Sequence, residues 1–180
     1  MSNLAKRIAG IHIQAKSYIR IVYSPRPFVS FQNVKQPLKD GEREKPKGLW
    51  YACDKEWKEF VQKYWKSQKD KYRHKYLLEV NLSRMCVLRT KQEVKTFNRI
   101  YGYTNDYGQE LIDWGEVGKD YDGIEICPYQ NDLKYQLSWY QGWDVAGGCI
   151  WGSSAFKSIS EVDNDISDDE YNLDSEWDLS

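Results

Sequence analysis

The stretch Lys45–Phe60, KPKGLWYACDKEWKEF, decides the fold because it joins a short strand directly to a lysine-rich helix. A glycine followed by apolar and aromatic side chains at 48–52 is typical of a short strand. Asp54 is a suitable N-cap residue, and the apolar residues after it recur at the spacing of one buried helix face. The residues on that face are Trp57, Phe60, Val61, Tyr64 and Trp65.

Outside this stretch, local patterns predict further strands and one more helix. The strands are expected at 18–23, 76–80, 85–88 and 121–129, with a last one at either 143–145 or 148–151. Thr90 and Glu93 have the spacing of a capping box, so a second helix is expected from that point to Gly102. This order of elements predicts an α+β fold with mixed, largely antiparallel sheets and a few helices.

The charge divides the chain into a basic body and an acidic end. Residues 158–180 hold nine acidic residues and no basic one, so the preceding 157 residues hold all 26 basic residues and the other 18 acidic ones. We expect one domain over 1–158 and a disordered acidic tail over 159–180, because the tail has too few apolar residues to order itself. The body, at about +8, would suit a polyanionic partner such as a nucleic acid or a nucleotide phosphate.

Cysteine usage and hydropathy bear on the compartment. Cys53, Cys86, Cys127 and Cys149 lie far apart without a CxxC pair, and with only two histidines no zinc site is indicated. Reduced cysteines in an intracellular protein are the simplest interpretation. No stretch approaches the roughly 18 apolar residues of a membrane span, and the first residues lack the apolar core of a signal peptide. We therefore expect a cytoplasmic protein without a membrane partner.

Several familiar catalytic motifs are missing, and one acidic strand stands out. The sequence contains no GxGxxG, GxxxxGK[ST] or GxSxG motif. The segment Asp122–Gln130, DGIEICPYQ, places a carboxylate inside an apolar strand, which is costly unless the group is paired, solvated or functional. Alternation puts Glu125 and Cys127 on the face opposite Ile124 and Ile126. A solvent-facing glutamate on an edge strand remains an equal alternative at this point.

Three segments together resemble the ADP-ribosyltransferases of the diphtheria-toxin and poly-ADP-ribose-polymerase type. KGLWYACDKEWKEFVQKY, at 47–64, is similar to that group's second motif, in which a G-L-Y-F-A-like strand runs into a helix with a late tyrosine. EICPYQ, at 125–130, resembles the third motif, which begins with the catalytic glutamate. IRIVYSPR, at 19–26, lies where the first strand is expected. The resemblance covers about 18–151 and implies transfer of ADP-ribose from NAD to a protein or nucleic acid, with release of nicotinamide.

The resemblance also implies roles for individual residues. Glu125 matches the catalytic glutamate that hydrogen-bonds the nicotinamide ribose. Trp50 matches the tyrosine that stacks on nicotinamide, and Tyr51 is a second candidate for the same wall. This interpretation requires the Glu125 carboxylate to be buried beside the Trp50 indole, where it could stabilise the positive charge that develops on the ribose.

Four further residues are expected to bind NAD. Ser24 falls where the histidine that binds the adenosine-side ribose usually stands, and its neighbour Tyr23 is on the same strand. Arg20 could instead mimic the arginine of the family's arginine-serine-glutamate branch. Gly48 would give a ligand close access to the backbone. No metal is implied.

Two other classes of function remain open. The chain could be a non-enzymatic nucleic-acid-binding or nucleotide-binding module that uses the lysine-rich helix and exposed aromatic residues. It could also be an interaction protein whose acidic tail engages a partner, or folds back on its own basic body and regulates it.

Overall fold

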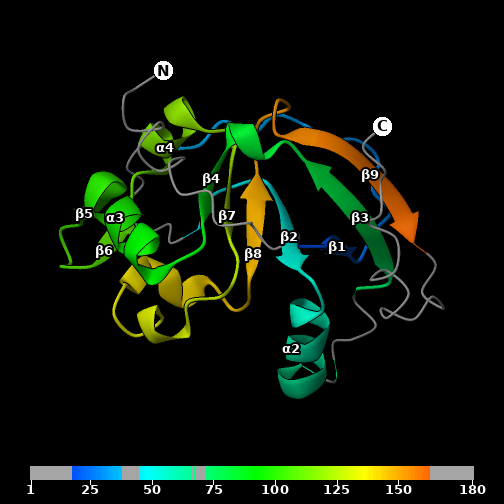
Figure 1. Cartoon of the computed structure of the whole chain (residues 1–180), viewed down its shortest axis with the longest axis horizontal. Coiled ribbons are helices and arrows are strands. Elements are labelled where there is room, and N and C mark those ends of the chain that lie inside the picture. The colour runs from blue at the N-terminus through cyan, green and yellow to red at the C-terminus, as the bar shows by residue number, and fades with distance from the viewer. Residues whose placement is uncertain (1–17, 38–44, 66, 68–71, 163–180) are drawn as a thin grey trace, which may run out of the picture.

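The computed structural model describes residues 18–37, 45–65, 67 and 72–162 (Figure 1). A seven-stranded sheet has the strand order β4-β7-β8-β2-β1-β3-β9, and β5 and β6 form a separate two-stranded sheet. Strands β4 and β7 pair in parallel, while the other pairs are antiparallel. The expected α+β class with mixed, largely antiparallel sheets is confirmed.

The strands of the large sheet are β1 (Arg20–Ser24), β2 (Leu49–Cys53), β3 (His74–Val80), β4 (Met85–Leu88), β7 (Gly123–Ile126), β8 (Gly147–Ile150) and β9 (Phe156–Val162). The small sheet consists of β5 (Gly102–Thr104) and β6 (Glu110–Ile112). The helices are α2 (Glu56–Tyr64), α3 (Lys91–Tyr101) and α4 (Trp114–Asp120), with 3-10 turns η2 (Leu82–Arg84), η3 (Asn131–Leu133) and η4 (Ser138–Gly142).

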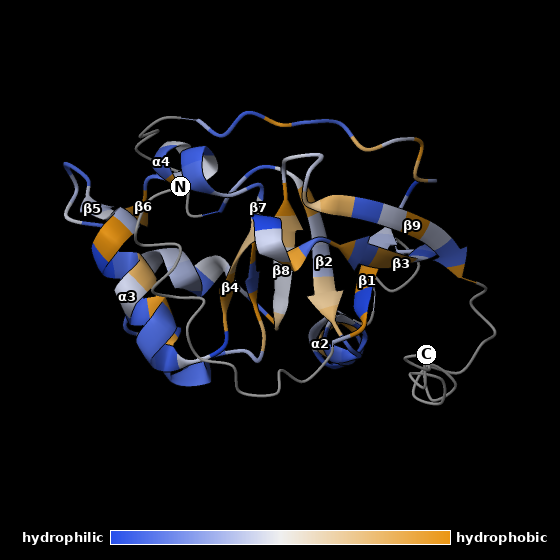
Figure 2. Cartoon of the chain, turned by 45° about the horizontal axis from the view of Figure 1, so that its top comes forward, coloured by the Kyte–Doolittle hydropathy of each residue, from blue (hydrophilic) through white to orange (hydrophobic). Residues whose placement is uncertain are grey.

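Helix α3 forms as its sequence predicts. The Thr90 side chain accepts from the Glu93 backbone N–H, and the Glu93 carboxylate accepts from the Thr90 backbone N–H. The inward residues Val94, Phe97 and Tyr101 are buried. With α4 and η4, helix α3 covers one face of the β4-β7-β8 part of the sheet, over a core rich in tryptophan (Figure 2).

Helix α2 departs from its prediction at both its start and its buried face. Asp54 has a positive φ of 54° and is not the N-cap; its carboxylate accepts a hydrogen bond from the Ile19 backbone N–H at 2.9 Å. Of the α2 residues, Val61 is buried, whereas Tyr64 is 60% exposed. The helix extends away from the end of β2 (Figure 1), so little of the domain is available to cover its aromatic face.

Strand β9 was not predicted, and it moves the expected boundary of the domain. Ile159 pairs with Leu78 of β3, and the pairing continues to Val162 opposite Lys75. The expected start of the tail at 159 is therefore wrong by four residues, because pairing with β3 supplies the order that composition alone does not. Residues 163–180 lie outside the described part of the chain.

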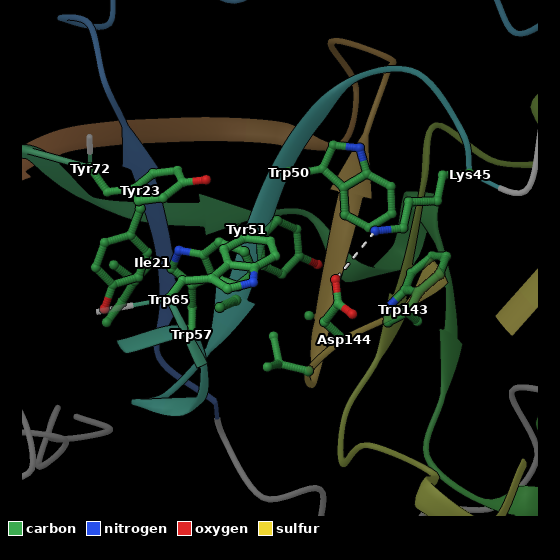
Figure 3. A pocket seen from close by; sticks show the side chains of 13 residues that line it. Ile21, Tyr23, Lys45, Trp50, Tyr51, Trp57, Trp65, Tyr72, Trp143 and Asp144 are labelled. Carbon is green, nitrogen blue, oxygen red and sulfur yellow. Dashed lines mark ion pairs between the residues drawn. The ribbon is translucent and has the colours of Figure 1, made fainter. Parts of the chain in front are cut away.

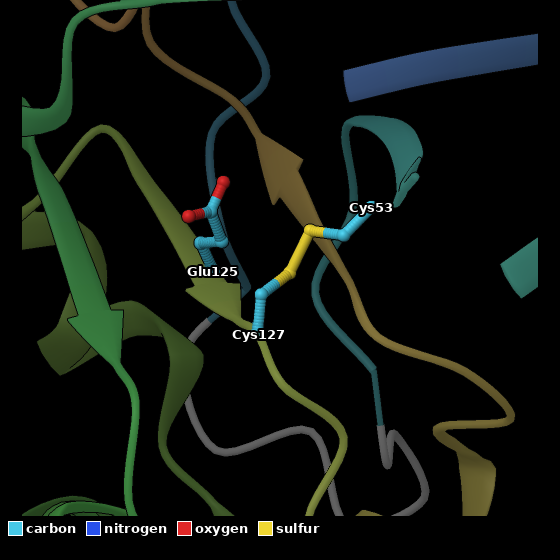
Figure 4. A group of neighbouring side chains, drawn as sticks. All are labelled: Cys53, Glu125 and Cys127. Carbon is cyan, nitrogen blue, oxygen red and sulfur yellow. A yellow bond between two sulfur atoms is a disulfide. The ribbon is translucent and has the colours of Figure 1, made fainter. Parts of the chain in front are cut away.

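A disulfide joins Cys53 at the end of β2 to Cys127 just after β7 (Figure 4). Their Cα atoms are 6.6 Å apart although 74 positions separate them in the sequence. The expectation that all cysteines are reduced is wrong for this pair, while Cys86 and Cys149 are free and buried. No helix within the described ranges is long and apolar enough to cross a membrane.

Candidate functional site

The pairing register places the two principal candidates on opposite faces of the large sheet. Trp50 pairs with Cys149 of β8, whereas Glu125 pairs with the adjacent Gly148. Directly paired residues project to the same face, and successive residues of one strand project to opposite faces. The expectation that the Glu125 carboxylate lies beside the Trp50 indole is therefore wrong, although Glu125 is buried as expected.

The Glu125 carboxylate is enclosed by donors from three other strands or strand ends. Its side chain is 0% exposed. It accepts hydrogen bonds from Arg20 Nε at 2.5 Å and Nη2 at 3.1 Å, and from the Tyr51 hydroxyl at 2.8 Å. Arg89 Nη2 forms an ion pair with Glu125 Oε1 at 2.8 Å, the same oxygen that accepts from Arg20 Nη2. A buried charge is tolerated only when it is paired and hydrogen-bonded in this way. Glu125 therefore does not face solvent, and it is not on an edge strand, because β7 lies between β4 and β8.

Burial and the carboxylate together fix the protonation of the partners. Burial raises the pKa of Tyr51 well above its usual value, and the negative charge of Glu125 raises it further. Burial by itself would lower the pKa of Arg20, but the hydrogen bond and charge of Glu125 outweigh that effect and the net pKa is raised. Both shifts favour a neutral Tyr51 hydroxyl that donates and a cationic Arg20 guanidinium.

Gly148 makes room for the hydrogen bond between Tyr51 and Glu125. A Cβ atom built at Gly148 would lie 2.3 Å from the Tyr51 hydroxyl oxygen, far inside van der Waals contact. The Tyr51 ring thus lies directly over Gly148 of β8, the strand between β2 and β7. The pair Gly147-Gly148 in the sequence was a signal for this close approach.

Sequence reasoning missed Arg89, which follows β4 by one residue. Its Nη1 donates to the Cys127 carbonyl at 2.9 Å, and its guanidinium lies 4.9 Å from the centre of the Tyr18 ring. Parity along β4 offered a signal, because Val87 pairs with Glu125 and Arg89 projects to the same face. Arg89 is thus a second cation for the same carboxylate.

The disulfide sulfurs also adjoin this cluster. The two sulfur atoms and a Glu125 carboxylate oxygen lie within 4.8 Å of one another (Figure 4). Such a set could hold a metal ion only if the sulfurs were thiolates. Both belong to the disulfide, and two arginines already neutralise the carboxylate. This cluster therefore ties strands together rather than offering a ligand site.

A pocket with aromatic walls lies at the Trp50 indole (Figure 3), with a volume of about 300 Å3. Its sides come from the β1–β2 region, from α2 and the segment after it, and from the loop before β8. The aromatic residues that line it, besides Tyr51, are Tyr23, Trp50, Trp57, Trp65, Tyr72 and Trp143. The partly exposed face of α2 thus contributes to a cavity rather than to a closed core.

Two opposite charges also line this pocket. The Lys45 ammonium lies 5.2 Å from the centre of the Trp50 ring and 3.8 Å from the Asp144 carboxylate. Asp144 is 30% exposed, and its other oxygen is 4.0 Å from Lys134. Sequence reasoning did not select Asp144. The only signal was its position in a Trp-Asp pair that follows Gly142, which folding brings next to Trp50.

Each of the remaining predicted residues lies in the aromatic pocket, in the pocket and the Glu125 cluster together, or outside both. Tyr23 lines the pocket, and Tyr51 belongs to both places because it lines the pocket and its hydroxyl binds Glu125. Ser24 lies at the end of β1 and donates to the Arg26 carbonyl at 2.6 Å, outside both. A Cβ at Gly48 would lie 2.3 Å from the Ile150 carbonyl oxygen, so the close approach at Gly48 is to β8 and not to a ligand.

Comparison with known proteins yielded no match to any family model, curated protein or solved structure.

Proposed function

We propose that the aromatic pocket binds the nicotinamide end of NAD and that the protein transfers ADP-ribose from NAD to a macromolecular acceptor. The observation that carries the proposal is that Trp50, Trp57 and Trp65 line one pocket, with Trp50 on the side opposite the other two (Figure 3). These residues come from a strand and from the helix and turn that follow it, which is the strand-to-helix order of the ADP-ribosyltransferase motif, although Tyr64, which matches the late tyrosine of that motif, is 60% exposed and does not line the pocket. Flat rings stack favourably between such side chains.

The size and charges of the pocket support a single ring with its sugar. A volume of about 300 Å3 is at the lower end of the range for ligand sites, too small to enclose a whole dinucleotide. The ammonium of Lys45, which lies over the Trp50 ring, is suited to a phosphate group that extends out of the pocket. The opposite carboxylate, Asp144, is suited to a positively charged ring or sugar.

The test is nicotinamide release by the full-length chain incubated with NAD, combined with tryptophan fluorescence to follow binding. We expect Trp50→Ala to weaken NAD binding by a factor of about 5 to 150, corresponding to about 1–3 kcal/mol for one lost stacking contact. Tyr107→Ala is the matched control, since Tyr107 is 85% exposed on the loop between β5 and β6. If NAD neither changes the fluorescence and melting temperature nor is consumed, the proposal is wrong.

A second candidate is nucleic-acid binding without turnover, favoured by the exposed side of α2. Lys63 lies 5.0 Å from the centre of the Tyr64 ring, and both side chains face solvent. Aromatic and basic groups in such contact are typical of single-strand binders. This candidate predicts single-stranded nucleic-acid binding that weakens steeply with salt and is reduced by Tyr64→Ala, with no release of nicotinamide from NAD by the wild type.

A further inference from the structure

We propose that Asp144, and not Glu125, is the carboxylate that stabilises the sugar cation when the nicotinamide bond breaks. The inference rests on the proposed function, because it concerns the same pocket and the same reaction. It corrects the role that the sequence resemblance gives to Glu125.

Glu125 cannot serve the pocket in this fold. Its side chain projects to the face opposite Trp50, because Glu125 pairs with Gly148 while Trp50 pairs with Cys149. It is 0% exposed, and both carboxylate oxygens are already held by arginine and tyrosine donors. A ligand that reached this carboxylate would have to pass through the sheet or displace two buried ion pairs.

Asp144 meets the requirements that Glu125 does not. It lines the same cavity as Trp50 and projects toward it in Figure 3. Its two ion pairs, at 3.8 Å and 4.0 Å, are longer than hydrogen bonds and leave its oxygens able to accept a new partner. At 30% exposed it is accessible to a ligand, and aromatic side chains line the same pocket.

The loop that carries Asp144 is held in place on both sides. The carbonyl of the preceding residue, Trp143, accepts a hydrogen bond from the Tyr129 hydroxyl at 2.6 Å. Two residues later, the Ala146 backbone N–H donates to the Glu56 carboxylate at 2.8 Å. Glu56 is in the first turn of α2, so the Asp144 loop and the helix that carries Trp57 are fixed relative to each other. Such positioning of a charged group before the reaction is what electrostatic stabilisation of a transition state requires.

The reaction that this arrangement would assist is cleavage of the bond between nicotinamide and ribose in NAD. The bond between the ribose C1′ and the nicotinamide nitrogen breaks, and its electron pair stays on the nitrogen, so that nicotinamide leaves as a neutral molecule. Asp144 faces the positive charge left at C1′. An oxygen of water or of the macromolecular acceptor then bonds to C1′, and the proton of that oxygen passes to Asp144 or to solvent.

The experiment compares three variants of the full-length chain: Asp144→Asn, Glu125→Gln and Asp132→Asn. Asp132 is the matched control, an aspartate that is 61% exposed and paired with Lys91 outside the pocket. We expect Asp144→Asn to bind NAD and to melt near the wild-type temperature, while nicotinamide release falls by a factor on the order of 10²–10³. We expect Glu125→Gln to melt at a lower temperature and to release nicotinamide at close to the wild-type rate per folded molecule.

The outcomes separate the inference from the function on which it rests. Wild-type turnover in Asp144→Asn would overturn the inference alone, as would a folded Glu125→Gln variant that binds NAD without cleaving it. A wild-type protein that neither binds nor cleaves NAD would overturn the proposed function, and the inference with it. If Glu125→Gln fails to fold, the comparison of Asp144→Asn with Asp132→Asn still decides the matter.

Discussion

On one face of the large sheet the Glu125 carboxylate is sealed from solvent by Arg20, Arg89 and Tyr51, while on the other face the Asp144 carboxylate borders an open pocket. Both acids are paired with cations, but the pairs differ in distance and exposure. The short, enclosed pairs of Glu125 connect strands β1, β2, β4 and β7. In this protein the buried carboxylate of Glu125 has fixed partners and holds strands together. The partly exposed carboxylate of Asp144 has long ion pairs, so its partners can be exchanged for a ligand.

The largest expected effect on stability is that of Glu125→Gln, which sharpens this comparison. It leaves Arg20 and Arg89 buried together without their shared anion, and loss of one partner of a buried pair costs about 3–5 kcal/mol. Chemical denaturation monitored by circular dichroism measures the free energy of unfolding. Asp144→Asn, whose pairs are long and partly exposed, should change it by less than about 0.5 kcal/mol. Equal losses in the two variants would remove the distinction between the faces.

Reducing the disulfide tests how much this second link next to Glu125 contributes to stability. Cys53 and Cys127 are separated by 74 positions, and closing a loop of that size stabilises a fold by about 4 kcal/mol in the chain-entropy model. Reduction of the wild type should therefore lower the free energy of unfolding by about 2–4 kcal/mol. The double variant Cys53→Ala/Cys127→Ala is the control, because its stability should not respond to a reductant. A wild type equally indifferent to reductant would contradict the prediction.

Tyr51→Phe removes one donor from Glu125 and keeps the ring. A hydrogen bond to a charged group contributes about 1.5–3 kcal/mol, so the free energy of unfolding should fall by roughly that amount. The neighbouring substitution Trp50→Phe, on the opposite face, retains an aromatic ring and should cost less. Thermal unfolding of both variants under the same conditions gives the ranking, and a reversed order would contradict the prediction.

The smallest effect concerns alkaline pH and the loop of Asp144. Burial raises the pKa of Tyr129 to about 12, and the nearby Asp144 charge adds to the shift. Because the folded pKa lies above the unfolded value of about 10, the stabilising contribution of Tyr129 is complete below pH 10 and is lost as the pH rises toward 12. Tyr129→Phe should show a shallower decline of stability over that range. Unfolding curves from pH 9 to 12 measure the two slopes, and identical slopes would refute this assignment.

Local patterns in the sequence predict the elements that depend on neighbouring residues. The Thr90–Glu93 capping box, the buried face of α3 and the opposite projection of Glu125 and Ile124 all follow from spacings of one to four residues. These features need no knowledge of what lies across the sheet.

Features that depend on long-range pairing could not be predicted in the same way. Whether Trp50 shares a face with Glu125 is decided by β8, which enters between their strands from more than 20 residues further along the chain. A shift of one residue in either pairing would reverse the answer. The Cys53–Cys127 bond and the approach of Asp144 to Trp50 depend on that same register. Their signals were single residues without a local pattern.

The glycine at position 148 has a consequence for how this sheet assembles. With the Tyr51 ring directly above it, this position accepts hydrogen and no larger substituent. If β8 slipped by one residue toward Cys149, the ring would meet a thiol side chain. The Tyr51 ring therefore disfavours a slip of β8 in that direction relative to β2. A Cβ atom at position 148 would also lie 2.5 Å from the Ile124 backbone carbonyl oxygen, so a smaller residue at position 51 would not by itself make room for a larger residue 148.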